Sequence, residues 1–538
     1  MGISLWDSYP PKVSDDQLQY LAQTVKDWTI FNGLTVRPNP SIVSEESNPN
    51  HVLATNAPVT LYPSPFPKQC FEQAEDLQKV YNELYAAIAT DEEWLGEVMK
   101  ELVEVDDFLA NLWKIHLQVK EEGYVQDLSL GMFRSDYMLH VPDDSSSPSL
   151  KQVEFNTISS SFGGLAVRVA DLHRELATYP DPTHSISYPP HPLFNTATSA
   201  SITSGGYPPT NEAVDTLASA LITAHQSYRD SRTSPPLPQC ILFLVQDNER
   251  NLFDQMALSQ HIRTTNREIP TFRIPTSKIL SQTSIPASSE NPSRPLIYTH
   301  PANPNARYEV TVVYFRALYA PTEYDTPAAW AARHHLERSA AIKCPSILLH
   351  LSGSKKVQQV LTSTDPSHLE RFLPKTSKET LDSLRASFAP QYSMSEGPDS
   401  EGVRIALDPD LAQKHVLKPQ REGGGNNIYR SNIPTFLKGI SEKEYKQYIL
   451  MELIQPPSKA GNVALRSDGQ IVSGDVISEL GIFGTCLWRS KVGSQEKNIL
   501  QNRMGGYLLR TKARDSDEGG VAAGFSSLDS LILYEEAV

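Results

Sequence analysis

The stretch Lys418–Asn427 (KPQREGGGNN) combines the residue types that bind nucleotide phosphates. Three consecutive glycines let the backbone approach a ligand closely and direct several N–H groups at one anion. Lys418 supplies a point charge for phosphate, and Glu422 can hold the magnesium ion that accompanies it. We interpret the stretch as a mobile glycine-rich loop over the phosphates of ATP. A flexible glycine turn with charged neighbours is the alternative, and these residues alone do not decide between the two.

A second group of candidate ligands lies on a predicted strand over residues 151–159 (KQVEFNTIS). Its period of two puts Glu154 and Asn156 on one face, and Val153 and Phe155 on the other. A carboxylate and an amide oxygen two residues apart suit a hard cation such as Mg²⁺, although a solvated strand face is the alternative. The serines at 159–161 precede an expected helix start and offer hydroxyls and N–H groups to a carboxylate or phosphate.

Basic residues stand at the ends of two further predicted elements. Lys355 and Lys356 lie in the first turn of a helix that follows Gly353. Lysines there oppose the helix dipole, so an anionic ligand would explain them; an exposed basic turn is the alternative. Near the C-terminus, Arg510 and Lys512 alternate on a predicted strand and therefore share one face.

Apolar periodicity predicts the elements that position these residues. Helices are expected over 15–35 and, in several pieces, over 68–122, where apolar residues recur at helical spacing. The continuous apolar runs 241–245 and 310–315, each followed by a predicted helix, indicate a small parallel α/β unit. Further strands are expected near 132–138, 415–417, 448–454, 472–483 and 508–512. The Pro- and Ser-rich segments 37–67, 176–212 and 275–308 are predicted to be loops.

Size and charge narrow the class of protein. A chain of 538 residues is expected to form two to four domains. Its net charge of −15 argues against a general nucleic-acid or anionic-membrane binder, so a phosphate site must be a local group of basic residues. The sequence has no apolar run long enough for a transmembrane helix and no recognisable signal peptide. Four widely spaced cysteines form no CxxC pair, which favours a reducing, cytoplasmic environment.

Eight motifs together resemble the eukaryotic-type glutathione synthetases, an ATP-grasp ligase family. They are MFRSDYM (132–138), VEFNTISSSFGGL (153–165), ERNLFDQ (249–255), VVYFR (312–316), LERSAAIKCPSI with SGSKKVQQ (336–359), VLKPQREGGGNN (416–427), ISELGIFG (477–484) and LLRTKA with GGVAAG (508–524). The resemblance spans nearly the whole chain. It implies ATP-dependent ligation of γ-glutamylcysteine to glycine through an acyl phosphate, with Mg²⁺ as cofactor, in a cytoplasmic homodimer.

The resemblance also implies an α/β (α+β) ATP-grasp fold with an inserted small parallel α/β substrate-binding domain and a glycine-rich lid. We expect an N-terminal helical and ATP-grasp body over residues 1–235 and the substrate-binding domain over 236–350. The rest of the ATP-grasp body would occupy 351–538, with the lid at about 400–475. No nucleic acid or membrane is expected among the partners.

Family site residues carry over onto matching positions of this chain. The implied metal ligands are Glu154, Asn156 and Glu422. The implied ATP contacts are Lys355, Lys418, Glu422, Gly423, Gly424, Gly425, Asn426, Asn427, Tyr429, Met451, Glu452, Leu453, Ile454, Glu479, Lys512 and Glu518. The implied peptide contacts are Arg134, Ile158, Ser159, Ser160, Ser161, Glu249, Arg250, Asn251, Gln255, Arg316, Ala317, Leu318, Tyr319, Arg510, Val521 and Ala522. Arg510, Arg134 and Lys418 would carry the catalytic charge stabilisation.

Three positions depart from the family pattern. Leu318 stands where the family usually has glycine, which bears on the peptide pocket. Leu453 replaces a lysine and Glu518 an aspartate, and both bear on nucleotide affinity. Two other functions stay open: a catalytically silent ATP- or peptide-binding relative, and a ligase of the same type that adds β-alanine or serine.

Overall fold

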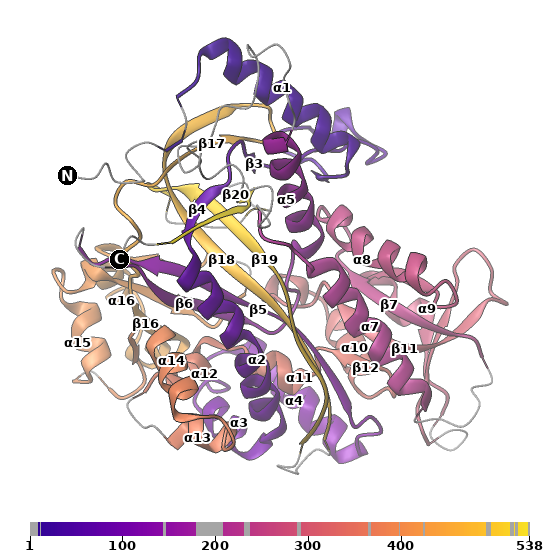
Figure 1. The fold of residues 1–538 in the computed structure, drawn as a ribbon. Coiled ribbons are helices and arrows are strands. Elements are labelled where there is room, and N and C mark those ends of the chain that lie inside the picture. The colour runs from indigo at the N-terminus through magenta and orange to yellow at the C-terminus, as the bar shows by residue number, and fades with distance from the viewer. Residues whose placement is uncertain are drawn as a thin grey trace.

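Three larger β-sheets, with helices packed against them, make up the fold in this computed structural model (Figure 1). The structure describes residues 9–10, 12–143, 147–178, 208–230, 237–287, 292–363, 367–397, 399–422, 425–490, 497–516, 521 and 526–535. The described part mixes helix and sheet throughout, which agrees with the predicted α/β class.

The largest sheet has seven strands in the order β17-β3-β20-β19-β18-β5-β6. Their bounds are β17 Gly461–Leu465, β3 Val59–Thr60, β20 Ser526–Asp529, β19 Lys497–Ala513, β18 Ile471–Ser490, β5 Leu128–His140 and β6 Ser149–Asn156. The last four neighbours, β19-β18-β5-β6, pair antiparallel. Side chains along β5 alternate between two core clusters, with Phe133 and Tyr137 in one and Met132 in the other.

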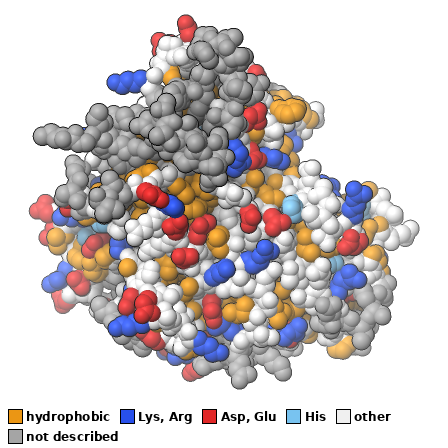
Figure 2. All heavy atoms as spheres, viewed as in Figure 1, with side chains coloured by type: hydrophobic (Ala, Val, Ile, Leu, Met, Phe, Trp, Pro, Cys, Tyr) orange, Lys and Arg blue, Asp and Glu red, His pale blue; other side chains and the backbone are white. Residues whose placement is uncertain are grey.

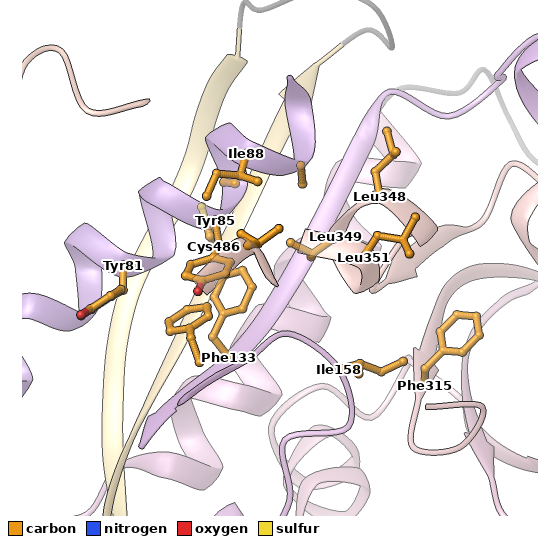
Figure 3. Packing of buried hydrophobic residues seen from close by; sticks show 14 of the residues in the cluster. Tyr81, Tyr85, Ile88, Phe133, Ile158, Phe315, Leu348, Leu349, Leu351 and Cys486 are labelled. Carbon is orange, nitrogen blue, oxygen red and sulfur yellow. The ribbon is translucent and has the colours of Figure 1, made fainter. Parts of the chain in front are cut away.

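Helices cover both faces of this sheet. Helix α2 (Lys68–Thr90) packs on one face, where Tyr85 stacks on Phe155 with ring centroids 4.0 Å apart. Figure 3 shows Tyr85 of α2 beside Phe133 and Cys486 of the sheet, and Tyr81 and Ile88 of the same helix belong to the same core cluster. Helices α5 (Gly163–Thr178) and α7 (Ala213–Asp230) pack on the other face.

The second sheet confirms the predicted parallel unit. Strands β7 (Gln239–Val245), β8 (Thr271–Pro275), β11 (Arg307–Phe315) and β12 (Ile342–Cys344) pair in parallel. Helices α8 (Leu252–Thr265) and α10 (Pro327–Glu337) occupy the expected positions. The loop prediction for 275–308 is wrong, because it contains α9 (Ile279–Gln282), β9 (Thr283–Ser284) and β10 (Leu296–Thr299). The last two add to the sheet antiparallel, and this pairing between segments has no local sequence signal.

The third sheet is antiparallel and carries the Lys418–Asn427 stretch. Its order is β13 (Gln391–Ser393), β16 (Tyr448–Glu452), β14 (His415–Pro419) and β15 (Ile428–Tyr429). Helices α15 (Glu401–Leu407) and α16 (Asn432–Leu437) join it in a core of its own. The stretch therefore connects two paired strands, β14 and β15, and its ends are fixed by that pairing.

The N-terminal helices agree with those predicted from the spacing of apolar residues. Helix α1 spans Asp15–Phe31, and the 68–122 segment divides into α2, α3 (Glu92–Lys100) and α4 (Asp107–Glu122). The 37–67 segment was expected to be a loop, but it includes short strands β2 (Thr55–Asn56), β3 and β4 (Ser64–Pro67). The remaining elements are β1 Thr35–Val36, α11 Ile347–Ser352, α12 Lys355–Leu361, α13 Ser367–Phe372, α14 Lys378–Ser387, β21 Leu531–Tyr534 and the 3-10 turns Glu45–Ser47, Thr276–Lys278, Pro321–Glu323, Ala412–Lys414 and Glu442–Gln447.

Helix apolarity and the distribution of surface charge complete the description of the fold. Within the described residues, no helix combines the length and apolarity that crossing a membrane requires. On the face drawn in Figure 2, basic and acidic side chains are interspersed.

Candidate functional site

Charged side chains from four neighbouring strands meet at a cavity of about 340 Å³. The strand register sets this arrangement: Arg134 of β5 lies opposite Asn156 of β6, and Asp136 opposite Glu154. On the other side, Glu479 of β18 lies opposite Arg510 of β19. Residues directly opposite each other in a sheet have neighbouring side chains. The sheet therefore brings together residues that are hundreds of positions apart in the chain.

Asp136 is the carboxylate at the centre of this group, and its side chain is fully buried. Its two oxygens accept hydrogen bonds from Arg134 Nε at 2.6 Å and Nη2 at 2.8 Å. The same carboxylate accepts Nη2 of Arg510 and Nδ2 of Asn156, each at 2.9 Å. Arg510 also pairs with Glu479. The two arginines proposed for catalysis are thus held by one carboxylate that the sequence analysis did not single out.

Lys355 bridges the two carboxylates predicted as metal ligands. Its Nζ lies 2.9 Å from Glu154 Oε2 and 3.3 Å from Glu422 Oε1. Burial raises the pKa of Glu422 to about 7. Burial also favours a raised pKa for Glu154, but the positive charges of Lys355 and Lys418 have the larger effect, so the pKa of Glu154 is lowered. Lys356 instead donates from Nζ to Ser393 and Ser395, so only the first of the two lysines reaches the cavity.

Lys418 enters the cavity from β14 and donates its Nζ to the Val153 carbonyl at 3.0 Å. Burial lowers the pKa of Lys418 to about 8. A β-bulge explains this contact, since the β5–β6 register shifts between Asp136 and Tyr137. The prediction that Val153 shares the core face with Phe155 is therefore wrong, and Val153 lines the cavity wall. Phe155 is buried in the core as expected.

Most of the implied ATP contacts line this cavity. Its lining includes Lys355, Lys418, Glu422, Asn426, Asn427, Tyr429, Met451, Glu452, Leu453, Ile454, Glu479 and Lys512. Gly425 has φ of +80°, a left-handed conformation that glycine adopts without strain, and it does not line the cavity. Gly423, Gly424 and Glu518 lie outside the described residues.

Of the implied peptide contacts, this cavity is lined by Arg134, Ile158–Ser161, Tyr319, Arg510 and Val521. Ser159 and Phe162 both have positive φ, of 52° and 74°, so this loop is held in a conformation that such residues rarely adopt. Asp254 of α8 holds it by accepting the backbone N–H groups of Phe162 and Gly164. In Figure 3, Ile158 and Phe315 lie near each other, and both belong to one core cluster.

Several implied peptide contacts do not line this cavity: Glu249, Arg250, Asn251, Gln255, Arg316, Ala317 and Leu318. Arg316 is buried beside it and donates to Ser161 Oγ at 2.8 Å and to Asp254 at 2.9 Å. Arg250 and Asn251 line an adjoining cavity of about 760 Å³. The two cavities share Phe162, Lys512, Arg514 and Val521 as lining residues. Ala522 lies outside the described residues.

The implied metal ligands fit a hard cation. Glu154 and Glu422 converge on one Lys355 ammonium group, which shows that both carboxylates face the same point. Asn156 donates its amide nitrogen to the Arg134 carbonyl and to Asp136, which leaves its Oδ1 as the ligating atom. The described residues contain no group of three His, Cys, Asp or Glu side chains that could hold a metal by themselves. An amide oxygen and nucleotide phosphates would complete the set.

The sequence analysis missed three residues that hold or shape this site: Asp136, Asp254 and Gly481. Asp136 and Asp254 lie inside the motifs MFRSDYM and ERNLFDQ, but nothing local distinguishes them from solvated carboxylates. Gly481 of β18 lies opposite Asp136. A Cβ at Gly481 would lie 2.7 Å from Cδ of Arg134 and 2.8 Å from Oδ1 of Asp136. The Arg134 side chain therefore occupies space that only glycine leaves open.

Gly481→Ala is expected to lower turnover at least about ten-fold, because the new methyl group displaces the Arg134–Asp136 pair from its position. Gly474→Ala on the same strand is the matched control, since a Cβ there meets no atom within 4 Å. Steady-state kinetics of both variants, with circular dichroism to confirm folding, make the comparison. Equal activities would show that the close approach at Gly481 has no role.

Comparisons with known proteins point to one family of enzymes. The family model for the eukaryotic glutathione synthase ATP-binding domain matches residues 15–533. The glutathione synthetase large chain of Schizosaccharomyces pombe is 36% identical, over 97% of this chain and 99% of that protein. The Homo sapiens glutathione synthetase is 36% identical, over 96% of each chain. Among solved structures, a glutathione synthetase-like effector from Globodera pallida has the same fold, with a TM-score of 0.67, 21% identity, and coverage of 97% of this chain and 98% of that one.

Proposed function

Because this chain belongs to the eukaryotic glutathione synthase family and is therefore an ATP-dependent ligase, we propose that it joins γ-glutamylcysteine to glycine and releases ADP and phosphate. One observation carries the proposal. A single cavity collects the basic groups Arg134, Arg510 and Lys355 beside the carboxylates Glu154 and Glu422. Such a site can neutralise both a transferring phosphoryl group and a substrate carboxylate.

The proposed reaction has two steps. The C-terminal carboxylate of γ-glutamylcysteine attacks the γ-phosphorus of ATP, forms an acyl phosphate and expels ADP. Glycine's amine then attacks the acyl carbon, and phosphate leaves from the tetrahedral intermediate as the amine loses a proton. Lys355 and Lys418 would neutralise the phosphoryl oxygens, while Arg134 and Arg510 would stabilise the oxyanion on the acyl carbon.

Glu154, Asn156 and Glu422 would hold Mg²⁺, which neutralises phosphate charge when it is bound. Lys355 would move from these carboxylates to the phosphate oxygens as the nucleotide enters. No nucleophilic side chain is required, and the burial of all four cysteines supports a mechanism without a thiol. Burial also raises the pKa of the Cys486 thiol to about 12, which keeps it protonated.

We further propose an ATP-grasp arrangement in which residues 236–350 form the inserted substrate-binding domain and residues 400–475 form the lid. The separate core of the third sheet supports a segment able to move as a unit. A closed lid would exclude water, which would otherwise hydrolyse the acyl phosphate. We also propose that the protein is a cytoplasmic homodimer, as the family resemblance implies. Light scattering of the purified protein would test the dimer.

The deciding experiment is coupled measurement of ADP release with γ-glutamylcysteine and a panel of acceptors. Glycine is expected to support turnover, with β-alanine and serine at least about ten-fold poorer in kcat/KM, because a pocket shaped for the smallest acceptor excludes added groups. Mass spectrometry of the product identifies the peptide formed. Turnover with β-alanine or serine equal to that with glycine would assign a different ligase activity. ADP release that needs no acceptor would contradict ligation itself.

Glu422→Gln is expected to raise the Mg²⁺ concentration needed for half-maximal turnover about ten-fold or more, because the site loses one of its two carboxylate ligands. The variant should stay folded, since Lys355 keeps its nearer carboxylate partner, Glu154, at 2.9 Å. Titrating Mg²⁺ at fixed ATP measures the change, and Glu442→Gln, at an exposed position that does not line the cavity, is the control. An unaltered Mg²⁺ requirement would remove Glu422 from the metal site.

A further inference from the structure

The Glu323 carboxylate accepts hydrogen bonds from three consecutive backbone N–H groups. Oε1 accepts from Leu318 N at 3.0 Å, and Oε2 accepts from Tyr319 N at 2.9 Å and Ala320 N at 3.1 Å. Gln246 donates its Nε2 to the same Oε1 and to the Tyr319 hydroxyl, both at 3.1 Å. A carboxylate that accepts several N–H groups makes charge-assisted bonds and holds a backbone segment in one conformation. Nothing in the sequence pattern singled this residue out.

The segment held by Glu323 has an unfavourable conformation. Leu318 has φ of +63°, in the left-handed region where a β-carbon clashes with the backbone, and its side chain is fully buried. The Tyr324 hydroxyl donates to the Leu318 carbonyl at 3.0 Å, which fixes the other side of the same residue. Strained residues of this kind persist only where the surroundings determine them. Glu323 and Tyr324 provide those surroundings for Leu318.

This segment connects the two parts of the candidate peptide site. It follows Arg316, which contacts Ser161 and Asp254, and it contains Tyr319, which lines the cavity. Glu323 does not line the cavity, so it acts through the loop and not on the substrate. Any relaxation of Leu318 toward an ordinary φ would rotate the following peptide and move Tyr319 relative to the cavity.

We propose that Glu323 is a positioning residue for peptide binding: its carboxylate holds residues 318–320 in a strained conformation and thereby places Tyr319 at the cavity wall. The proposal rests on the proposed binding of γ-glutamylcysteine at this loop. The nucleotide side of the cavity is formed by other strands, so it should be unaffected. Loss of Glu323 should therefore weaken binding of the peptide and leave binding of ATP unchanged, whereas general unfolding would weaken both.

Glu323→Ala is expected to raise KM for γ-glutamylcysteine about ten-fold or more, with KM for ATP within about two-fold of the parent value. Glu323→Gln keeps one acceptor oxygen and should have an intermediate effect. Glu444→Ala is the matched control, because Glu444 also caps a short 3-10 turn by accepting a backbone N–H, that of Ser441 at 2.8 Å, but does not line the cavity. It should change neither constant.

A second substitution tests the role of strain. Glycine adopts a positive φ without strain, so Leu318→Gly removes the strain at this position. In that background, Glu323→Ala should raise KM for the peptide by clearly less than in the parent, about three-fold at most. An equal effect in both backgrounds would overturn the link to Leu318. Equal rises in the KM values of peptide and ATP would show a merely structural role and overturn the proposal.

Hydrogen exchange separates this inference from the proposed function. Amides of residues 318–320 should exchange faster in Glu323→Ala than in the parent, with no substrate present, because they lose their acceptor. If the parent fails to use γ-glutamylcysteine, the proposed function falls, while faster exchange would still support the loop-holding role. Unchanged exchange at these amides would overturn that role whatever the activity.

Discussion

Replacing Arg510 by alanine is expected to lower the turnover number about 10²- to 10³-fold, or about 3–4 kcal/mol in the barrier. The Arg510 guanidinium is held by Asp136 and Glu479 at the cavity, in position to fork two N–H groups onto an acyl phosphate. Its interaction strengthens as negative charge builds in the transition state, so the loss should fall on kcat. KM for ATP should change by no more than about three-fold.

Lys512→Ala is the matched control for this prediction. Lys512 is two residues further along the same strand and lines the same cavity. The family resemblance predicts that it contacts the nucleotide. Its loss should raise KM for ATP with a smaller change in kcat. Measuring both constants for both substrates in the two variants tests the assignment. If Arg510→Ala weakens only ATP binding and Lys512→Ala only peptide binding, the two roles are reversed.

Asp136→Asn is expected to destabilise the fold by about 3–5 kcal/mol and to abolish turnover. The substitution preserves shape but removes the charge that compensates two buried arginines, Arg134 and Arg510. It also turns one acceptor into an N–H donor that faces other donors. Denaturant unfolding measures the stability change, and the ligase assay on folded protein at low temperature measures the activity.

Asp127→Asn provides the comparison at a half-exposed site. Asp127 pairs with Arg489 at the far end of β18, where 38% of the Asp127 side chain is exposed. Water compensates both charges there, so the change should be at most about 1 kcal/mol. Similar losses at positions 127 and 136 would mean that the Asp136 group contributes no more than a surface pair. A residue other than Asp136 would then have to hold Arg134 and Arg510 in place.

Local pattern alone determined a large part of this protein. Period-two alternation placed Glu154 with Asn156, and Arg510 with Lys512, at one cavity, and apolar runs predicted the parallel strands β7 and β11. Residue chemistry offered a phosphate and metal site as one of two interpretations of the Lys418–Glu422 stretch, and the structure places Lys418 and Glu422 at the same cavity. These inferences succeed because strand alternation and charge type depend on only a few neighbouring residues.

Tertiary structure alone decided which charges meet. Asp136 and Arg510 are 374 positions apart, and they touch only because β5 and β19 flank β18 in the sheet. The bulge at Val153, the close approach at Gly481 and the positive φ of Leu318 likewise arise from pairing and packing with distant segments. Register between remote strands is set by the cooperative packing of the whole sheet, so no short window of sequence contains it.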